Sequence, residues 1–149
     1  MKGFPDLPPL WLLLGLIVVW GFAKFLPLVE VFGPWAQPLA IALWGVGVGL
    51  VIWSAVWFWR KKTTIEPHHD PEVLIVEGPY KISRNPIYLG MLVILTGSVL
   101  WYGALGPVWV PPVFAWIVTV RFIRPEEQAL VRRFGQEASE YLGATRRWL

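Results

Sequence analysis

The apolar run from Trp35 to Trp59 limits most strongly what this chain can fold into. Gln37 and Ser54 are its only polar side chains, and a basic cluster at residues 60–62 ends it. At about 1.5 Å per residue, a helix over this run exceeds the roughly 30 Å hydrocarbon core of a bilayer. Hydrophobic residues make up 56% of the whole chain and charged residues only 15%. This composition argues against a soluble globule and excludes a disordered chain.

Three further apolar runs flank this one. We predict an all-α, polytopic membrane protein, with residues 1–149 in one domain and about four transmembrane helices at 10–29, 35–59, 87–102 and 105–123. Pro107, Pro111 and Pro112 fall in the last run and predict a kink or a late helix start. A cleaved signal peptide is the alternative for the first run, but no good small-residue cleavage site follows it.

The basic residues predict how the helices are oriented. Of the 13 Lys and Arg residues, only Lys24, near the end of the first run, lies on the side formed by residues 24–34 and 102–106. The other twelve lie on the opposite side. By the positive-inside rule, both termini, loop 60–86 and segment 124–149 are cytoplasmic. The basic balance is thereby explained without a nucleic-acid partner.

The two long cytoplasmic segments also have local patterns. In loop 60–86, Val73–Val76 is a β-like stretch. In segment 124–149, residues 126–134 read as an amphipathic helix that Gly135 ends, and a second short helix is expected around residues 137–141. Because these segments carry nearly all of the polar side chains, any chemistry is expected at the cytoplasmic face.

The start of the third apolar run combines a cation, an amide and a phenol in Arg84, Asn85 and Tyr88. Pro86 favours an extended conformation at Asn85 and suits the first helical turn. Free N–H groups at a helix start favour an anion, so a carboxylate could bind here. The alternative is an ordinary turn with an interfacial Tyr–Arg anchor.

Charged side chains also follow the fourth run, where Arg121, Arg124, Glu126 and Glu127 occur within seven positions. Adjacent carboxylates point about 100° apart on a helix, so one is expected to face the helix bundle. An inward carboxylate near the bilayer is a candidate binding group for an ammonium. The alternative is a solvated Glu pair compensated by nearby arginines.

Two other patterns have structural explanations that we prefer. His68-His69-Asp70 lacks the spacing of a metal site, so we expect a loop and no metal. Gly45 and Gly49 are four positions apart in the second run and predict close helix packing within the bundle. Close approach of the backbone to a ligand is the alternative, and a homo-oligomer contact through these two glycines is a further possibility.

An ordered set of motifs extends from about Thr63 to Trp148. It comprises Glu66-Pro67, the segment Leu74–Tyr80, Arg84-Asn85-Pro86-x-Tyr88-x-Gly90 and, after a two-span hairpin, Glu126-Glu127-x-x-Leu130, Phe134-Gly135, Tyr141 and Arg147-Trp148. In order and spacing, these motifs resemble isoprenylcysteine carboxyl methyltransferase-like and phospholipid methyltransferase-like membrane proteins. Many of those proteins have His where this chain has Asn85, and often Tyr where it has Ala138.

The resemblance implies a small helical membrane enzyme that holds S-adenosyl-L-methionine in a cytoplasmic pocket without a Rossmann domain. The implied cofactor-binding residues are Val73, Leu74, Ile75, Tyr80, Arg84, Asn85, Pro86, Tyr88, Glu126 and Glu127. One of the two glutamates would hold the cofactor ammonium. Arg121 or Arg124 would face a polar or acidic substrate head. Asn85 excludes a histidine acid/base role at its position.

The expected function is therefore S-adenosyl-L-methionine-dependent methyl transfer to a lipophilic or membrane-partitioned substrate. Its acceptor group, an isoprenylcysteine-type carboxylate, a phospholipid amine or a thiol, stays open. The expected partners are this substrate, taken from the bilayer or the cytoplasm, and membrane lipids. The rival function is a non-catalytic membrane scaffold or assembly subunit with the same fold.

Overall fold

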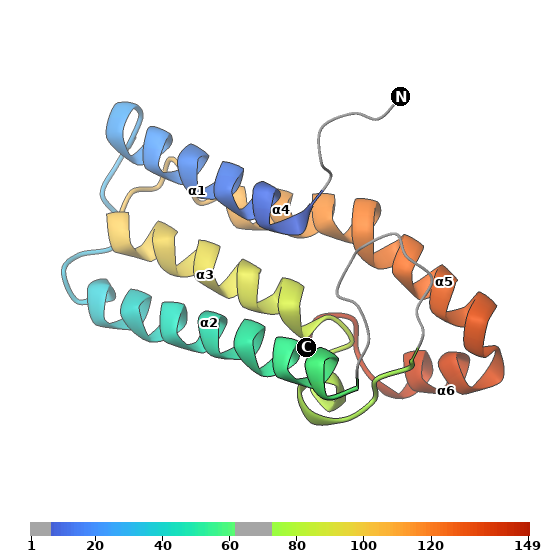
Figure 1. Cartoon of the computed structure of the whole chain (residues 1–149). Coiled ribbons are helices and arrows are strands. Elements are labelled where there is room, and N and C mark those ends of the chain that lie inside the picture. Colours follow the sequence, from blue (N-terminus) through green and yellow to red (C-terminus); the bar gives the residue numbers. More distant parts are fainter. Residues whose placement is uncertain (1–6, 62–72) are drawn as a thin grey trace.

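The computed structural model describes residues 7–61 and 73–149, and named helices account for all regular secondary structure in them (Figure 1). The elements are α1 (Pro8–Phe25), α2 (Ala36–Arg60), the 3-10 helix η1 (Gly78–Lys81), α3 (Pro86–Tyr102), α4 (Val110–Val118), the π-helical turn η2 (Thr119–Ile123), α5 (Arg124–Phe134) and α6 (Gln136–Ala144). By length and composition, α1 and α2 could each cross a membrane, and α3 is a shorter apolar helix.

The helix boundaries follow the predicted spans with two differences. α2 and α3 agree with the predicted ranges within one residue at each end. α1 stops at Phe25 rather than at residue 29 because Pro27 has no backbone N–H and disfavours a helical conformation at the residue before it. The fourth run becomes helical only at Val110, which is the late start that its prolines predict.

Helix α3 lies at the centre of the bundle, between α1 and α2, and also contacts α4 (Figure 1). The core beside it includes Leu95, Val118 and Phe122, all completely buried. On its other side, the Trp44 indole N–H of α2 donates to Ser98 Oγ at 3.1 Å. A half-buried donor and a buried acceptor thus satisfy each other inside an otherwise apolar contact.

Glycines bring α2 and α3 close together, but they are not the ones that we predicted. A Cβ built on Gly47 would lie 2.6 Å from the Gly90 carbonyl oxygen, so only glycine allows this backbone approach. Cβ atoms at Gly45 and Gly49 would meet nothing within 4 Å. The prediction that Gly45 and Gly49 pack inside the bundle is therefore wrong, because Gly47 faces α3 and they do not.

The α1–α2 and α3–α4 connections meet at one end of the bundle. The Val31 N–H donates to the Gly103 carbonyl at 2.8 Å, and the Leu105 N–H donates to the Val29 carbonyl at 2.9 Å. An isolated bridge pairs Glu30 with Ala104. The opposite end gathers the start of α1, the end of α2, the start of α3 and helices α5 and α6 (Figure 1).

The segment before α3 packs against the end of α2. Gly78 has a φ of +60° and lies directly against the Trp57 indole, where any Cβ would overlap the ring. Within the described residues, Val73–Val76 forms no strand, contrary to its β-like pattern. β propensity yields no strand here because none of those residues offers it a partner strand.

The last elements follow the predicted pattern. η2 joins α4 to α5 without interrupting the helix, and α5 ends where Gly135 adopts a φ of +56°. α6 then turns back toward the bundle (Figure 1). This reversal returns the C-terminal residues to the start of α3.

Candidate functional site

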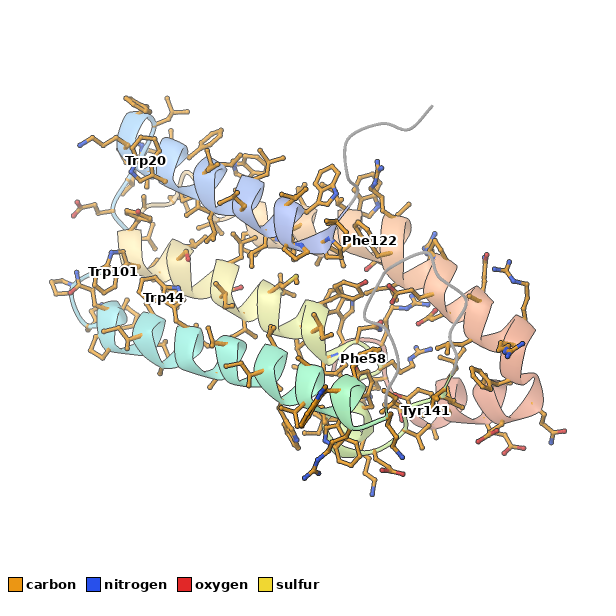
Figure 2. The ribbon with its side chains drawn as sticks, viewed as in Figure 1. Trp20, Trp44, Phe58, Trp101, Phe122 and Tyr141 are labelled. Carbon is orange, nitrogen blue, oxygen red and sulfur yellow. The ribbon has the colours of Figure 1, made fainter. Side chains whose placement is uncertain are left out.

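The loop before α3 is held from two sides through Tyr80. The Tyr141 hydroxyl of α6 donates to the Tyr80 carbonyl at 2.8 Å, and the Phe58 ring of α2 packs edge-on against the Tyr80 ring at 5.9 Å (Figure 2 labels Phe58 and Tyr141). Burial raises the pKa of Tyr141 to about 12 and also raises that of Tyr80. Both phenols therefore stay protonated near neutral pH and can act as hydrogen-bond donors.

The start of α3 is tied to the C-terminal segment. The Asn85 amide Nδ2 donates to the Arg147 carbonyl at 2.9 Å, and Ser83 Oγ donates to the same oxygen at 3.2 Å. The Arg84 N–H donates to the Arg146 carbonyl at 2.9 Å. Pro86 occupies the first turn as predicted, and Asn85 makes no side-chain cap bond to the helix. The side chain of Asn85 therefore orders the C-terminal segment instead of capping α3.

The two predicted glutamates have different partners. The Tyr88 hydroxyl of α3 donates to Glu126 Oε1 of α5 at 2.5 Å. Burial raises the pKa of Glu126 to about 7, the bond from Tyr88 lowers it, and the charge of Glu127 raises it again. Glu126 is thus a partly buried carboxyl group that exchanges its proton near neutral pH.

Glu127 belongs to a compact ionic group. The Arg147 guanidinium donates to both of its carboxylate oxygens, from Nε at 2.9 Å and from Nη2 at 2.6 Å. Arg84 Nη1 lies 3.1 Å from Glu127 Oε1. The Glu127 side chain is only 14% exposed, and two cations surround it. Its charge is compensated inside the protein.

We call Arg84, Tyr88, Glu126, Glu127 and Arg147 the charge cluster. It draws on the loop before α3, on α3, on α5 and on the C-terminal segment. Among the described residues, Arg84 Nε is a buried donor without a hydrogen-bond partner. A buried unpaired donor is costly, and an added carboxylate would satisfy it. The cluster thus offers a cationic donor for a carboxylate and a carboxyl group for an ammonium.

The other residues predicted to bind cofactor or substrate differ in how far they are buried. Ile75 is buried, Leu74 is half-buried and Val73 is exposed. Arg121 and Arg124 are both exposed, and the Arg121 guanidinium lies over the Trp11 ring at 5.3 Å. The Arg121 guanidinium thus packs against α1.

Two sequence patterns lie outside the described residues. His68-His69-Asp70 and Glu66-Pro67 fall within residues 62–72. Across residues 7–61 and 73–149, no group of three or more His, Cys, Asp or Glu side chains is arranged to hold a metal ion.

The sequence-based site omits Arg147, Ser83 and Tyr141. Arg147 and Tyr141 do occur among the motifs that carry the family resemblance, which is the signal that could have included them. Ser83 precedes Arg84 directly, but an isolated serine in a loop gives no functional signal of its own.

The fold and the cluster define a class, that of helical membrane proteins with a charged site at one end of an apolar bundle. The family model of phospholipid methyltransferases (PEMT) matches residues 35–137, which is more than half of the chain. The chain belongs to the phospholipid methyltransferase family. Comparison with curated proteins and with solved structures finds no match. Family membership and the two long apolar helices together indicate a membrane methyltransferase.

Proposed function

We propose that this protein transfers a methyl group from S-adenosyl-L-methionine to a membrane-partitioned substrate. The observation that carries the proposal is the contact between the two segments expected to bind the cofactor. Tyr88 bonds to Glu126, and Arg84 pairs with Glu127, so the start of α3 and the start of α5 share one site. The family match over residues 35–137 covers both segments.

The charge cluster suits both ends of an amino-acid zwitterion. Glu126 would receive the ammonium, and Arg84, with its unpaired Nε, would receive the carboxylate. Buried Ile75, Tyr80 and Pro86 lie in the same loop and helix start and would form apolar walls. The cofactor supplies an activated methyl group. The protein's own contribution is to align the acceptor and to exclude water.

Within this activity we propose a phospholipid amine as the acceptor, ahead of a carboxylate or a thiol. The family description names phospholipids as substrates. Exposed Arg121 and Arg124 stand where η2 passes into α5, beside the charge cluster in sequence, and would suit a lipid phosphate. Such a substrate would enter from the bilayer. We further propose four membrane crossings with both termini cytoplasmic, as the distribution of basic residues predicts.

The test is a calorimetric titration of purified protein in detergent with S-adenosylhomocysteine. We expect binding whose affinity rises with pH through about 7, because an ammonium favours ionised Glu126. Glu126→Gln should weaken it about 10- to 100-fold, since a charge-assisted hydrogen bond is lost. Glu137→Gln, on an exposed α6 position, is the matched control.

Two further outcomes bear on the proposal. No detectable binding by the wild-type protein at any pH would refute it. Undiminished binding by Glu126→Gln would refute the assignment of the ammonium site. Incubation with methyl-labelled cofactor and total membrane lipids then identifies the acceptor, and label on a carboxyl or thiol product would exclude the phospholipid amine.

The second candidate is a non-catalytic scaffold that associates through α2. It is favoured by one observation: Gly45 and Gly49 lie on the outer side of α2 with open space beyond them. Small residues at this spacing permit close contact with a second copy of the helix. Replacing both with Ile should then abolish self-association in detergent, measured by light scattering, while S-adenosylhomocysteine binding by the wild-type protein would be absent.

A further inference from the structure

The C-terminal segment, residues 145–149, returns to the start of α3 and contacts it repeatedly. Its backbone carbonyls at Arg146 and Arg147 accept bonds from Arg84, Ser83 and Asn85. Trp148 packs against the hydrophobic core. The hydrogen bonds to the backbone of residues 146 and 147 and the packing of Trp148 therefore fix the position of the Arg147 side chain.

That guanidinium forms a bidentate pair with Glu127. Its Nε and Nη2 bond to separate carboxylate oxygens, an arrangement that fixes orientation as well as distance. Arg84 contacts Oε1 of the same carboxylate. Glu127 is therefore held by two cations at a position one residue from Glu126.

Glu126 faces a different set of groups. Tyr88 of α3 donates to it, Glu127 on its own helix acts on it as a like charge, and Tyr80 of η1 is close enough to interact electrostatically. The cations Arg84 and Arg147 pair with the neighbouring Glu127. The Tyr141 hydroxyl of α6 donates to the Tyr80 carbonyl. The net charge beside Glu126 thus depends on whether Glu127 is neutralised.

We propose that Arg147 is a positioning residue of the site, which holds and neutralises Glu127 so that Glu126 alone serves as the carboxylate for the cofactor ammonium. This inference rests on the proposed function for the ligand, and on the observed ion pairs for the coupling. It also assigns the C-terminal segment a role, since the segment docks on the start of α3 and brings Arg147 to Glu127. Arg147 acts through Glu127 and is not itself a catalytic residue.

The proposal predicts opposite shifts for two variants. Arg147→Ala leaves Glu127 less neutralised, so the pH of half-maximal S-adenosylhomocysteine affinity should rise by about half a unit to one unit. Affinity at pH 7 should then fall about two- to fivefold and recover at pH 9. Glu127→Gln removes the like charge, so the same midpoint should fall.

Arg147→Lys retains the charge without the two-pronged bond and should leave the midpoint nearly unchanged. Arg133→Ala removes one exposed positive charge from α5 and is the control for net charge. Hydrogen exchange at the Arg84 amide, which bonds to the Arg146 carbonyl, reports whether the segment stays docked. Arg147→Ala should speed this exchange, and Arg133→Ala should not.

Thermal unfolding against pH, measured without ligand, separates the two hypotheses. The quantity to follow is the pH at which half of the pH-dependent stability change has occurred. If this pH midpoint rises in Arg147→Ala and falls in Glu127→Gln but no cofactor binds, the proposed function alone fails. If cofactor binds and neither variant moves either midpoint, the role assigned to Arg147 is wrong. Equal losses of affinity in both variants with unmoved midpoints would show a purely structural contact and would also overturn it.

Discussion

At the scale of single residues, the adjacent pair Glu126 and Glu127 shows how local position decides chemistry. The two side chains are identical, and they are neighbours on one helix. Glu127 lies between two arginines, whereas Glu126 lies against a phenol that donates at 2.5 Å. The environment thus leaves one carboxyl group compensated and the other able to change its protonation near pH 7.

This difference predicts how stability depends on pH. The pKa of Glu126 is about 7 in the folded protein against an ordinary 4.5, so the folded state binds more protons between these values. Its stabilising effect is complete below about pH 4.5 and is lost as pH rises through 7. In detergent, thermal stability should fall by about 1–3 kcal/mol between pH 5 and pH 8.

Matched variants isolate the contribution of Glu126. Glu126→Gln should remove most of this slope, and Glu137→Gln should retain it because that side chain is exposed. The two histidines of the chain are present in every variant, so any contribution from them cancels in the comparison. An unchanged slope in Glu126→Gln would contradict the raised pKa.

At the scale of secondary-structure elements, the α2–α3 contact depends on which glycine faces the neighbouring helix. Gly47→Ala should destabilise the protein by about 1–3 kcal/mol, because its Cβ would meet the Gly90 carbonyl and the Ile94 side chain at 2.6 Å. Gly45→Ala, two residues away, places its Cβ in open space and should be neutral or slightly stabilising. Chemical or thermal unfolding of both variants measures the difference, and equal effects would contradict the observed packing.

The same helices show what the sequence can and cannot specify. The ends of α2 and α3 were predictable, because a basic cluster ends one and Pro86 begins the other. The side of α2 that faces α3 was not predictable, because glycines at 45, 47 and 49 do not indicate how the helix is rotated about its axis.

The sequence predicted most residues of the site, but not which of them contact one another. Spacing on a helix shows that Glu126 and Glu127 diverge, but only the packed structure shows which of them meets Tyr88. The role of Arg147 depends on the reversal of the chain at Gly135 and on the return of α6. Contacts made over such separations in sequence leave no periodic pattern to read.

At the scale of the whole molecule, the two short connections meet at one end of the bundle and the charge cluster lies at the other. The hydrogen bonds between Val29–Phe32 and Gly103–Leu105 fix this arrangement. If the bundle crosses a membrane, those two connections share one side, and the cluster faces the other. Of the 11 Lys and Arg residues that the structure describes, all but Lys24 lie on the side of the cluster, which predicts that this side is cytoplasmic.

The chain has no cysteine, so single substitutions can report the orientation directly. In intact cells, a membrane-impermeant maleimide should label Leu105→Cys, an exposed position in the α3–α4 connection. It should label Gly143→Cys, exposed near the end of α6, only after the membrane is permeabilised. Val113→Cys, exposed on α4, should resist the reagent in both conditions because lipid would cover it. Labelling of Gly143→Cys in intact cells, with Leu105→Cys protected, would invert the predicted orientation. It would also place the charge cluster away from a cytoplasmic cofactor.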